Sequence, residues 1–254
     1  MTLGLCAVVA AGCGAGEFAV GLIYGTVAAN LAMVGMMRLC ARGQMVCRVG
    51  WVFAWLGLAL GCAWVAGRSV GLGPFGGLAL VLVGLIAVWL RLRQHTQNRD
   101  KLCETQPSNL RKWWQLALVL LAVIVGVVLL VRFYPVACAV CGVPDGIFAG
   151  VLVAPLLVLV AWLGMRRQPA WQAEKLVAAW LWANVGLATV AMGLITLVAG
   201  GIAFTQSTVV LTMPWVLGMT VISAVALAIK NKTARWWGGL VVMMYVAYVV
   251  SLFW

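Results

Sequence analysis

The sequence predicts an all-α polytopic membrane protein, and its composition and charge pattern carry that prediction. Of the 254 residues, 65% are hydrophobic and only 9% are charged, and a soluble domain of this length cannot bury so much apolar surface. The lysine and arginine residues gather in clusters that alternate with long uncharged runs, which is the positive-inside pattern of a multi-span protein. We therefore expect the lipid bilayer as a partner. The net charge of +12 does not indicate nucleic acid, because the cations flank apolar runs and suit anionic headgroups.

About eight runs are long enough for a full transmembrane helix, which takes about 20 apolar residues. They cover residues 18–37, 49–67, 69–90, 113–131, 136–165, two parts of 176–229, and 236–254. Residues 1–16 form one more apolar piece, which is short and rich in glycine and alanine. We expect this N-terminal piece to be a truncated span or a half-helix.

Local residues mark where the runs begin and end. The first long run ends at Arg38, and the third opens on the glycine and proline turn residues of 71–74. Tryptophan pairs open the runs at 113 and 236, as expected for anchors at the membrane interface. We expect 136–165 to be one long span, with Pro144 near its start, and the uncharged stretch to divide at the polar residues 205–208.

A polar, basic segment at residues 92–112 divides the chain into a first part, 1–91, and a second part, 113–254. Because cation-rich loops face the cytoplasm, the middle segment is expected inside and the C-terminus outside. The compact loops and the absence of sorting signals favour a bacterial inner membrane.

Two short matches relate the two parts of the chain. Phe75-Gly-Gly-Leu78 and Trp237-Gly-Gly-Leu240 lie 162 residues apart and each open a span. Ala29-Asn30-Leu31 and Ala183-Asn184-Val185 lie 154 residues apart, each inside a span. The two members of each pair are expected to run through the membrane in opposite directions. This arrangement indicates two inverted-topology repeats, which are typical of secondary transporters.

Small and polar residues share the first long run. Gly21 and Gly25 are four residues apart, a spacing that lets another helix backbone approach closely, so we expect a helix-packing role. Thr26 and Asn30 have the same spacing on an adjoining face. Their neutral oxygens suit either a dehydrated cation or a hydrogen bond between helices, and the residues alone leave both interpretations open.

This run resembles the signature helix of the calcium/cation antiporter superfamily, the membrane region of sodium/calcium exchangers. The signature has the form A-x-G-N-x-x-G-S-N-x-x-N, and the chain matches it at Ala19, Gly21, Gly25, Thr26 and Asn30, with threonine in place of serine. Leu22 and Val27 stand where the signature has asparagine. The likeness extends weakly over the whole chain, including the Arg235-Trp-Trp-Gly-Gly-Leu240 opening of the last span.

The resemblance implies cation transport by alternating access, with Na⁺, Ca²⁺ or H⁺ as possible transported ions and no cofactor. It implies a midplane site between the repeats, formed by Thr26, Asn30, Asn184 and Thr189. The family also has a G-T-S-x-P-E helix in each repeat, whose glutamate binds the ion. Here Pro155-Leu156 occupies the second Pro-Glu position, and the first such helix is mostly missing.

Acidic residues are rare, with five in the chain. Glu17 and Asp145 lie near the expected outer ends of spans. Glu17 is either an interfacial residue or an outer-vestibule ligand, and Asp145, after Pro144, is either a helix N-terminal cap or an ion ligand. No serine, histidine and acid set, zinc motif or phosphate loop is present, so an enzyme is not expected.

Two functions follow from these patterns. The first is an integral membrane protein that resembles a cation antiporter. The second is a scaffold or accessory subunit that keeps the fold but has lost the ion site, and it is motivated by the missing glutamates. A chain shortened at its N-terminus would also explain the incomplete first repeat.

Overall fold

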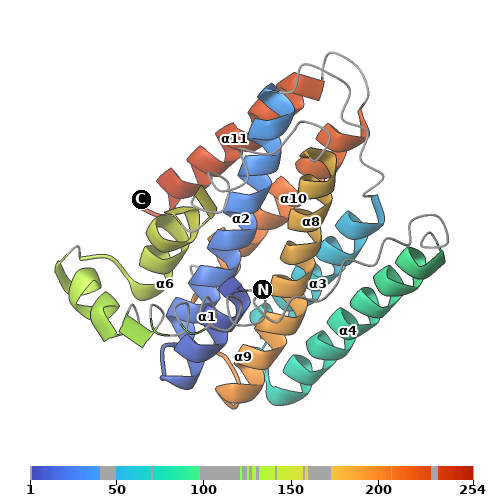
Figure 1. Ribbon diagram of the computed structural model, residues 1–254. Coiled ribbons are helices and arrows are strands. Elements are labelled where there is room, and N and C mark those ends of the chain that lie inside the picture. Colours follow the sequence, from blue (N-terminus) through green and yellow to red (C-terminus); the bar gives the residue numbers. More distant parts are fainter. Residues whose placement is uncertain are drawn as a thin grey trace.

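The computed structural model describes residues 2–40, 50–69, 71–97, 132–140, 142–156, 173–206, 208–229 and 234–253, together with positions 121, 125, 128, 129, 158 and 159. Every regular element in these ranges is helical, which confirms the predicted all-α class there (Figure 1). The elements, with η for π-helical segments, are α1 (Thr2–Gly12), α2 (Gly16–Cys40), α3 (Gly50–Ser69), α4 (Pro74–Gln97), α6 (Asp145–Ile147), η2 (Phe148–Val153), α8 (Ala173–Gly186), η4 (Leu187–Ala191), α9 (Met192–Val198), η5 (Thr208–Thr212), α10 (Met213–Ala228) and α11 (Ala234–Ser251).

Several described helices suit a membrane protein. Four are long and apolar enough to cross a bilayer: Gly16–Leu39, Pro74–Arg91, Val177–Val198 and Thr208–Ala228. The number rises to five if the bent pair formed by Arg132–Val140 and Asp145–Leu156 is one span. The expected span 113–131 falls almost entirely outside the described residues, so the total of eight spans stays a prediction.

The expected span 136–165 is bent in the part that the structure describes, and its being a single span stays a prediction. The chain bends by 108° between Arg132–Val140 and Asp145–Leu156. Gly142 has φ of +65°, a conformation that costs glycine little. Pro144 has no backbone N–H and cannot continue a helix that arrives from its N-terminal side. These two residues end one helix and allow the next to start in a new direction.

The break in the uncharged stretch 176–229 begins earlier than predicted. α9 ends at Val198 and η5 begins at Thr208, so the connection extends beyond the expected 205–208. Gly200 and Gly201 both have positive φ and turn the chain here. Ile202 then pairs with Leu72 through two backbone hydrogen bonds of 2.9 Å, which ties this connection to the turn before α4.

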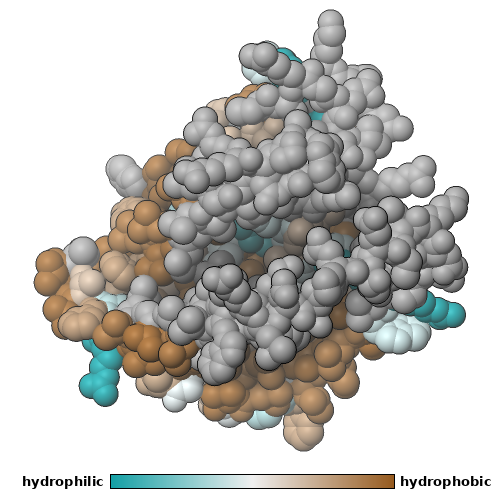
Figure 2. All heavy atoms as spheres, viewed as in Figure 1, coloured by the Kyte–Doolittle hydropathy of each residue, from teal (hydrophilic) through white to brown (hydrophobic). Residues whose placement is uncertain are grey.

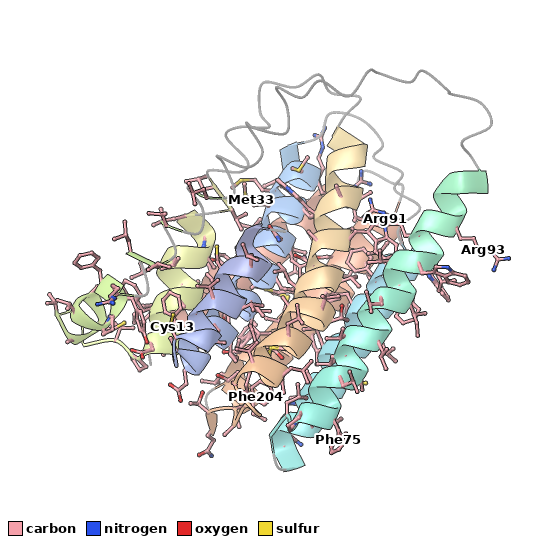
Figure 3. The ribbon with its side chains drawn as sticks, turned by 60° about the horizontal axis from the view of Figure 1, so that its bottom comes forward. Cys13, Met33, Phe75, Arg91, Arg93 and Phe204 are labelled. Atoms are coloured by element: carbon pink, nitrogen blue, oxygen red, sulfur yellow. The ribbon has the colours of Figure 1, made fainter. Side chains whose placement is uncertain are left out.

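The two ends of the helical bundle differ in charge. We call the end with Arg38, Arg91 and Arg235 the basic end, and the opposite end, with Glu17, the Glu17 end. Figure 3 shows Arg91 and Arg93 at one end of the molecule and Phe75 and Phe204 at the other. The helix α2 runs from the Glu17 end to the basic end, as does α4, whereas α8–α9 and α11 run in the opposite direction (Figure 1).

Contacts along α4 show that it is antiparallel to the continuous helix α8–η4–α9. A Cβ on Gly77 would lie 3.0 Å from the Gly193 carbonyl oxygen, and one on Gly84 would lie 2.5 Å from Thr189 Oγ1. The Arg91 guanidinium lies 5.0 Å from the Trp182 ring centre. The α4 helix also continues to Gln97, so residues 92–97 are helical where the sequence predicted the start of a loop.

The packing of α2 on α11 is also antiparallel and close. A Cβ on Gly238 would lie 2.6 Å from the Gly35 carbonyl oxygen. Next to this contact, Arg38 is only 3% exposed, although the sequence suggested an ordinary loop cation. Its guanidinium donates a 2.7 Å hydrogen bond to the Ile229 carbonyl oxygen at the C-terminus of α10, where positive charge is favourable.

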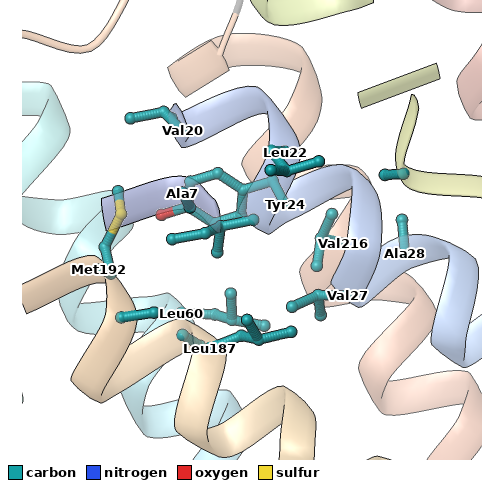
Figure 4. Packing of buried hydrophobic residues seen from close by; sticks show 14 of the residues in the cluster. Ala7, Val20, Leu22, Tyr24, Val27, Ala28, Leu60, Leu187, Met192 and Val216 are labelled. Atoms are coloured by element: carbon teal, nitrogen blue, oxygen red, sulfur yellow. The ribbon is translucent and has the colours of Figure 1, made fainter. Parts of the chain in front are cut away.

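The core of the bundle surrounds α2, whose apolar window is 89% buried. Figure 4 shows Tyr24 of α2 among buried apolar residues from neighbouring helices, including Ala7, Leu60 and Met192. By contrast, the apolar window of α4 is only 22% buried, and large apolar side chains are exposed along it: Phe75, Leu78, Leu82, Leu85, Ile86, Val88 and Trp89. Much of the visible surface outside the grey atoms in Figure 2 is hydrophobic, as a lipid-facing surface requires.

Candidate functional site

The two asparagines of the repeated Ala-Asn motif meet in the core. Asn30 Nδ2 donates a 2.6 Å hydrogen bond to Asn184 Oδ1, and it joins α2 to α8. Asn30 is 7% exposed and Asn184 is fully buried. A hydrogen bond of this kind between two membrane helices contributes about 0.6–2 kcal/mol to the free energy of their association. The bond therefore fixes the register of α2 against α8.

One atom of this pair is left without a hydrogen bond. Asn184 Nδ2 is buried and has no partner among the described residues. An unsatisfied buried amide group costs about 1–3 kcal/mol, so the position of Asn184 is not explained by stability alone. The pair is a buried polar contact between α2 and α8.

The two threonines predicted to join the asparagines are placed differently. Thr26 lies one turn from Asn30 on the same face of α2, and its hydroxyl donates a 2.6 Å bond to the Leu22 carbonyl oxygen. Thr189 donates a 2.6 Å bond to the Val185 carbonyl oxygen. However, Thr189 Oγ1 packs against Gly84 of α4. The structure therefore brings Thr26 close to the asparagine pair but directs Thr189 toward another helix.

The two carboxylates lie at the Glu17 end, away from the asparagine pair. Glu17 is in the first turn of α2 and is exposed, and about 20 Å of helix separates it from Asn30 at the usual rise per residue. Asp145 is the first residue of α6, whose N-cap is Pro144, so the alternative that Asp145 is the N-cap was wrong. Its carboxylate is instead hydrogen-bonded to the Tyr134 side chain, which also lies in the field of Glu17.

A cavity with a volume of ≈ 50 Å³ opens beside Glu17. The ends of α2, α6, η5 and α11 surround it. Its polar lining residues are Glu17, Tyr24, Thr205, Thr208, Thr212 and Tyr248. Of these residues, only Glu17 was predicted from the sequence as a site residue. The available signal was the group of hydroxyl residues at the ends of two uncharged runs, which was interpreted only as a chain break.

Gly21 and Gly25 lie in backbone contact with a second glycine pair. A Cβ on Gly21 would overlap the backbone of Gly146, and one on Gly25 would overlap that of Gly150. The two partners are also four residues apart, so each helix presents the same small-residue spacing to the other. A packing role was predicted for Gly21 and Gly25, whereas none was predicted for Gly146 and Gly150, although their spacing is visible in the sequence.

The described residues contain no group of three or more His, Cys, Asp or Glu side chains that could hold a metal ion. In the described part of the chain, a hard cation could be bound by oxygen atoms of threonine, asparagine and single carboxylate side chains. The fold and these groups define an all-helical protein with apolar helices of membrane-spanning length and a polar contact at its centre. No family model matches the chain, and neither the curated proteins nor the solved structures give a match.

Proposed function

We propose that the chain is an inverted-repeat membrane transporter that moves a small cation by alternating access. The hydrogen bond between Asn30 and Asn184 is the observation that carries this proposal. These residues occupy the same place in two Ala-Asn matches, on helices of opposite direction. Inverted-repeat transporters hold their substrate at the interface between the repeats, and the asparagine pair lies at that interface.

The packing of the other matched helices supports the same arrangement. α2 packs on α11, and α9 packs on α4, so each part of the chain packs on the other. If the two parts are repeats, the contact between Gly77 and Gly193 has a counterpart. The offset of 162 residues relates Gly77 to Gly239, and the offset of 154 residues relates Gly193 to Leu39. A Cβ on Gly239 would lie 3.7 Å from Leu39 Cδ1, so the corresponding contact exists.

The proposal includes the finer topology expected from the sequence. It has eight full spans, with α1 as a half-helix, and it places the basic end in the cytoplasm and the Glu17 end outside a bacterial inner membrane. In this arrangement the cavity beside Glu17 faces the outer solution. The resemblance to the calcium/cation antiporter superfamily motivates an ion-driven exchange of cations.

Oxygen chemistry at the asparagine pair suits a cation once the pair separates. The Thr26 hydroxyl donates a hydrogen bond to the Leu22 carbonyl oxygen, and the lone pairs of the hydroxyl oxygen remain able to bind an ion. Asn30 and Asn184 each add an amide oxygen. Next to Asn184 the helix continues as the π-helical segment η4, and such segments occur frequently at functional sites.

Reconstituted proteoliposomes test the proposed transport. We expect calcium or rubidium uptake driven by an outward sodium gradient or by a proton gradient, above the level of protein-free liposomes. Absence of flux for Na⁺, K⁺, Ca²⁺ and H⁺, from protein that unfolds cooperatively after extraction, would contradict the proposal.

A second candidate is a non-transporting scaffold or accessory subunit. The observation in its favour is that the central polar groups already bind one another or their own helices, while Glu17 lies about 20 Å away along α2. This candidate predicts that the chain is purified in a stable complex with another membrane protein. Isolation as a solitary, cation-binding monomer would count against it.

A further inference from the structure

The cavity at the Glu17 end has the lining, the charge and the size of an ion site. We propose that it binds one small monovalent cation of the alkali class, as the outer entry site of the transporter. The inference rests on the proposed function for its role in transport. Binding itself can be measured without transport, so the two can fail separately.

Hydroxyl oxygens from α2, η5, α11 and the connection before η5 line the cavity. Thr205 Oγ1 and Thr208 Oγ1 are 2.8 Å apart and share a hydrogen bond. The side chains of Thr212 and Tyr248 are also hydrogen-bonded to each other. A hydroxyl that takes part in one hydrogen bond keeps lone-pair capacity, and hard cations prefer neutral and anionic oxygen ligands. The lining therefore offers several ligands of the correct kind within one space.

The charge around the cavity matches a single positive charge. Of the residues that line the cavity, Glu17 is the charged one, and its carboxylate contributes a charge of −1. A monovalent cation neutralises it, whereas a divalent cation leaves an excess charge that is costly to hold away from bulk water.

The size of the cavity limits what it can hold. A volume of ≈ 50 Å³ gives room for about three to five water molecules at 10–15 Å³ each. A small ion with a few retained waters fits this space.

Exposure decreases from the mouth of the cavity to its floor. Glu17 is exposed at the mouth. Among the residues of the floor, Thr212 is 8% exposed and Tyr248 is 2% exposed. A cation that enters past Glu17 can therefore exchange bulk water for protein oxygens in steps. Tyr24 also lines the cavity, and about 9 Å of α2 separates it from Asn30.

Cation titrations of the purified full chain in detergent test the site. The background is choline chloride, the probes are LiCl, NaCl, KCl and CaCl₂, and the readouts are calorimetry and the midpoint of thermal unfolding. We expect saturable binding of Na⁺ or K⁺. Thr212→Val and Glu17→Gln should each weaken it about 10- to 100-fold, as expected for loss of one contact to a charged group.

Matched controls separate local from general effects. Thr220→Val makes the same change on the helix that follows Thr212, but the Thr220 hydroxyl donates to the Val216 carbonyl oxygen at 2.7 Å, so binding should stay at the wild-type level. Glu104→Gln removes the same charge from the middle segment and should also leave binding unchanged. Thr212→Ser keeps the hydroxyl and should keep the affinity.

Three results would overturn the inference: no saturable monovalent binding by the wild-type protein, tighter binding of Ca²⁺ than of Na⁺ and K⁺, or unchanged affinity in both Thr212→Val and Glu17→Gln. Binding that obeys the predictions in a protein without flux keeps the site and removes the transport proposal. Flux with no cation binding at the cavity keeps transport and removes the site.

Discussion

Gly25 of α2 and Gly150 of η2 lie so close that a Cβ on Gly25 would overlap the backbone of Gly150. One turn earlier, Gly21 and Gly146 repeat the same contact. Two helices that begin at the Glu17 end therefore run in parallel with their backbones touching. This contact holds the start of α6 beside Glu17, so the cavity depends on it.

Gly25→Ala should destabilise the protein, because the added methyl group must displace the η2 backbone. Overpacking of this kind costs about 1–3 kcal/mol. The measurement is the thermal unfolding midpoint of the purified protein in detergent. Gly57→Ala is the matched control, because it lies on α3 and a Cβ there would meet nothing within 4 Å. Equal midpoints for the two variants would contradict the close contact.

The Asn30–Asn184 bond should appear as an energetic coupling. Asn30→Ala and Asn184→Ala each leave one buried amide without its partner, and each should cost about 1–3 kcal/mol in unfolding free energy. The double variant should cost less than the sum, with a coupling of about 0.6–2 kcal/mol. Additive costs would show that the two side chains do not interact.

Leu72 and Ile202 should be close enough for a disulfide. Their backbones exchange two hydrogen bonds of 2.9 Å in an antiparallel bridge, and Cα atoms in such a pair are about 5.5 Å apart, within the range of disulfides. Leu72→Cys with Ile202→Cys, in a background without the native cysteines, should crosslink within one chain under mild oxidation. Gel mobility with and without reductant measures this. Failure to crosslink would contradict the contact between the two turns.

The side of the membrane can be read from thiol labelling. Cys13 is exposed and lies in the turn between α1 and α2, at the Glu17 end, which we propose to face outward. A membrane-impermeant maleimide should label Cys13 in intact cells when the other native cysteines are replaced. Arg93→Cys at the basic end should be labelled only after permeabilisation. The reverse pattern would invert the proposed topology.

The all-helical class could be predicted from the sequence, because long apolar runs flanked by cations indicate helices in a lipid bilayer. The sequence also indicated Asn30 and Asn184 as a pair, because the same short Ala-Asn motif occurs inside two expected spans. The break near 205–208 was found, although Gly200 and Gly201 start it earlier. Pro144 was seen, but not the 108° bend that it makes together with Gly142.

Other parts of the site depend on tertiary packing that no local pattern contains. Thr189 has the residue type and burial of a site residue, but the π-helical segment η4 directs it against Gly84. Arg38 reads as a loop cation until the C-terminus of α10 is placed beside it. Thr212 and Tyr248 come together only when η5 and α11 pack, so their role in the cavity could not be predicted from spacing.

Cation flux through the Asn30→Ala variant tests the central claim, that the asparagine pair lies on the transport path. Thr196→Ala is the control, because it truncates another buried polar residue whose hydroxyl binds its own helix at the Met192 carbonyl oxygen. In proteoliposomes with equal amounts of folded protein, Asn30→Ala should lower the gradient-driven flux about tenfold or more, which corresponds to about 1.4 kcal/mol in the barrier, while Thr196→Ala keeps the wild-type rate. Equal flux for Asn30→Ala and the wild-type protein would contradict the account.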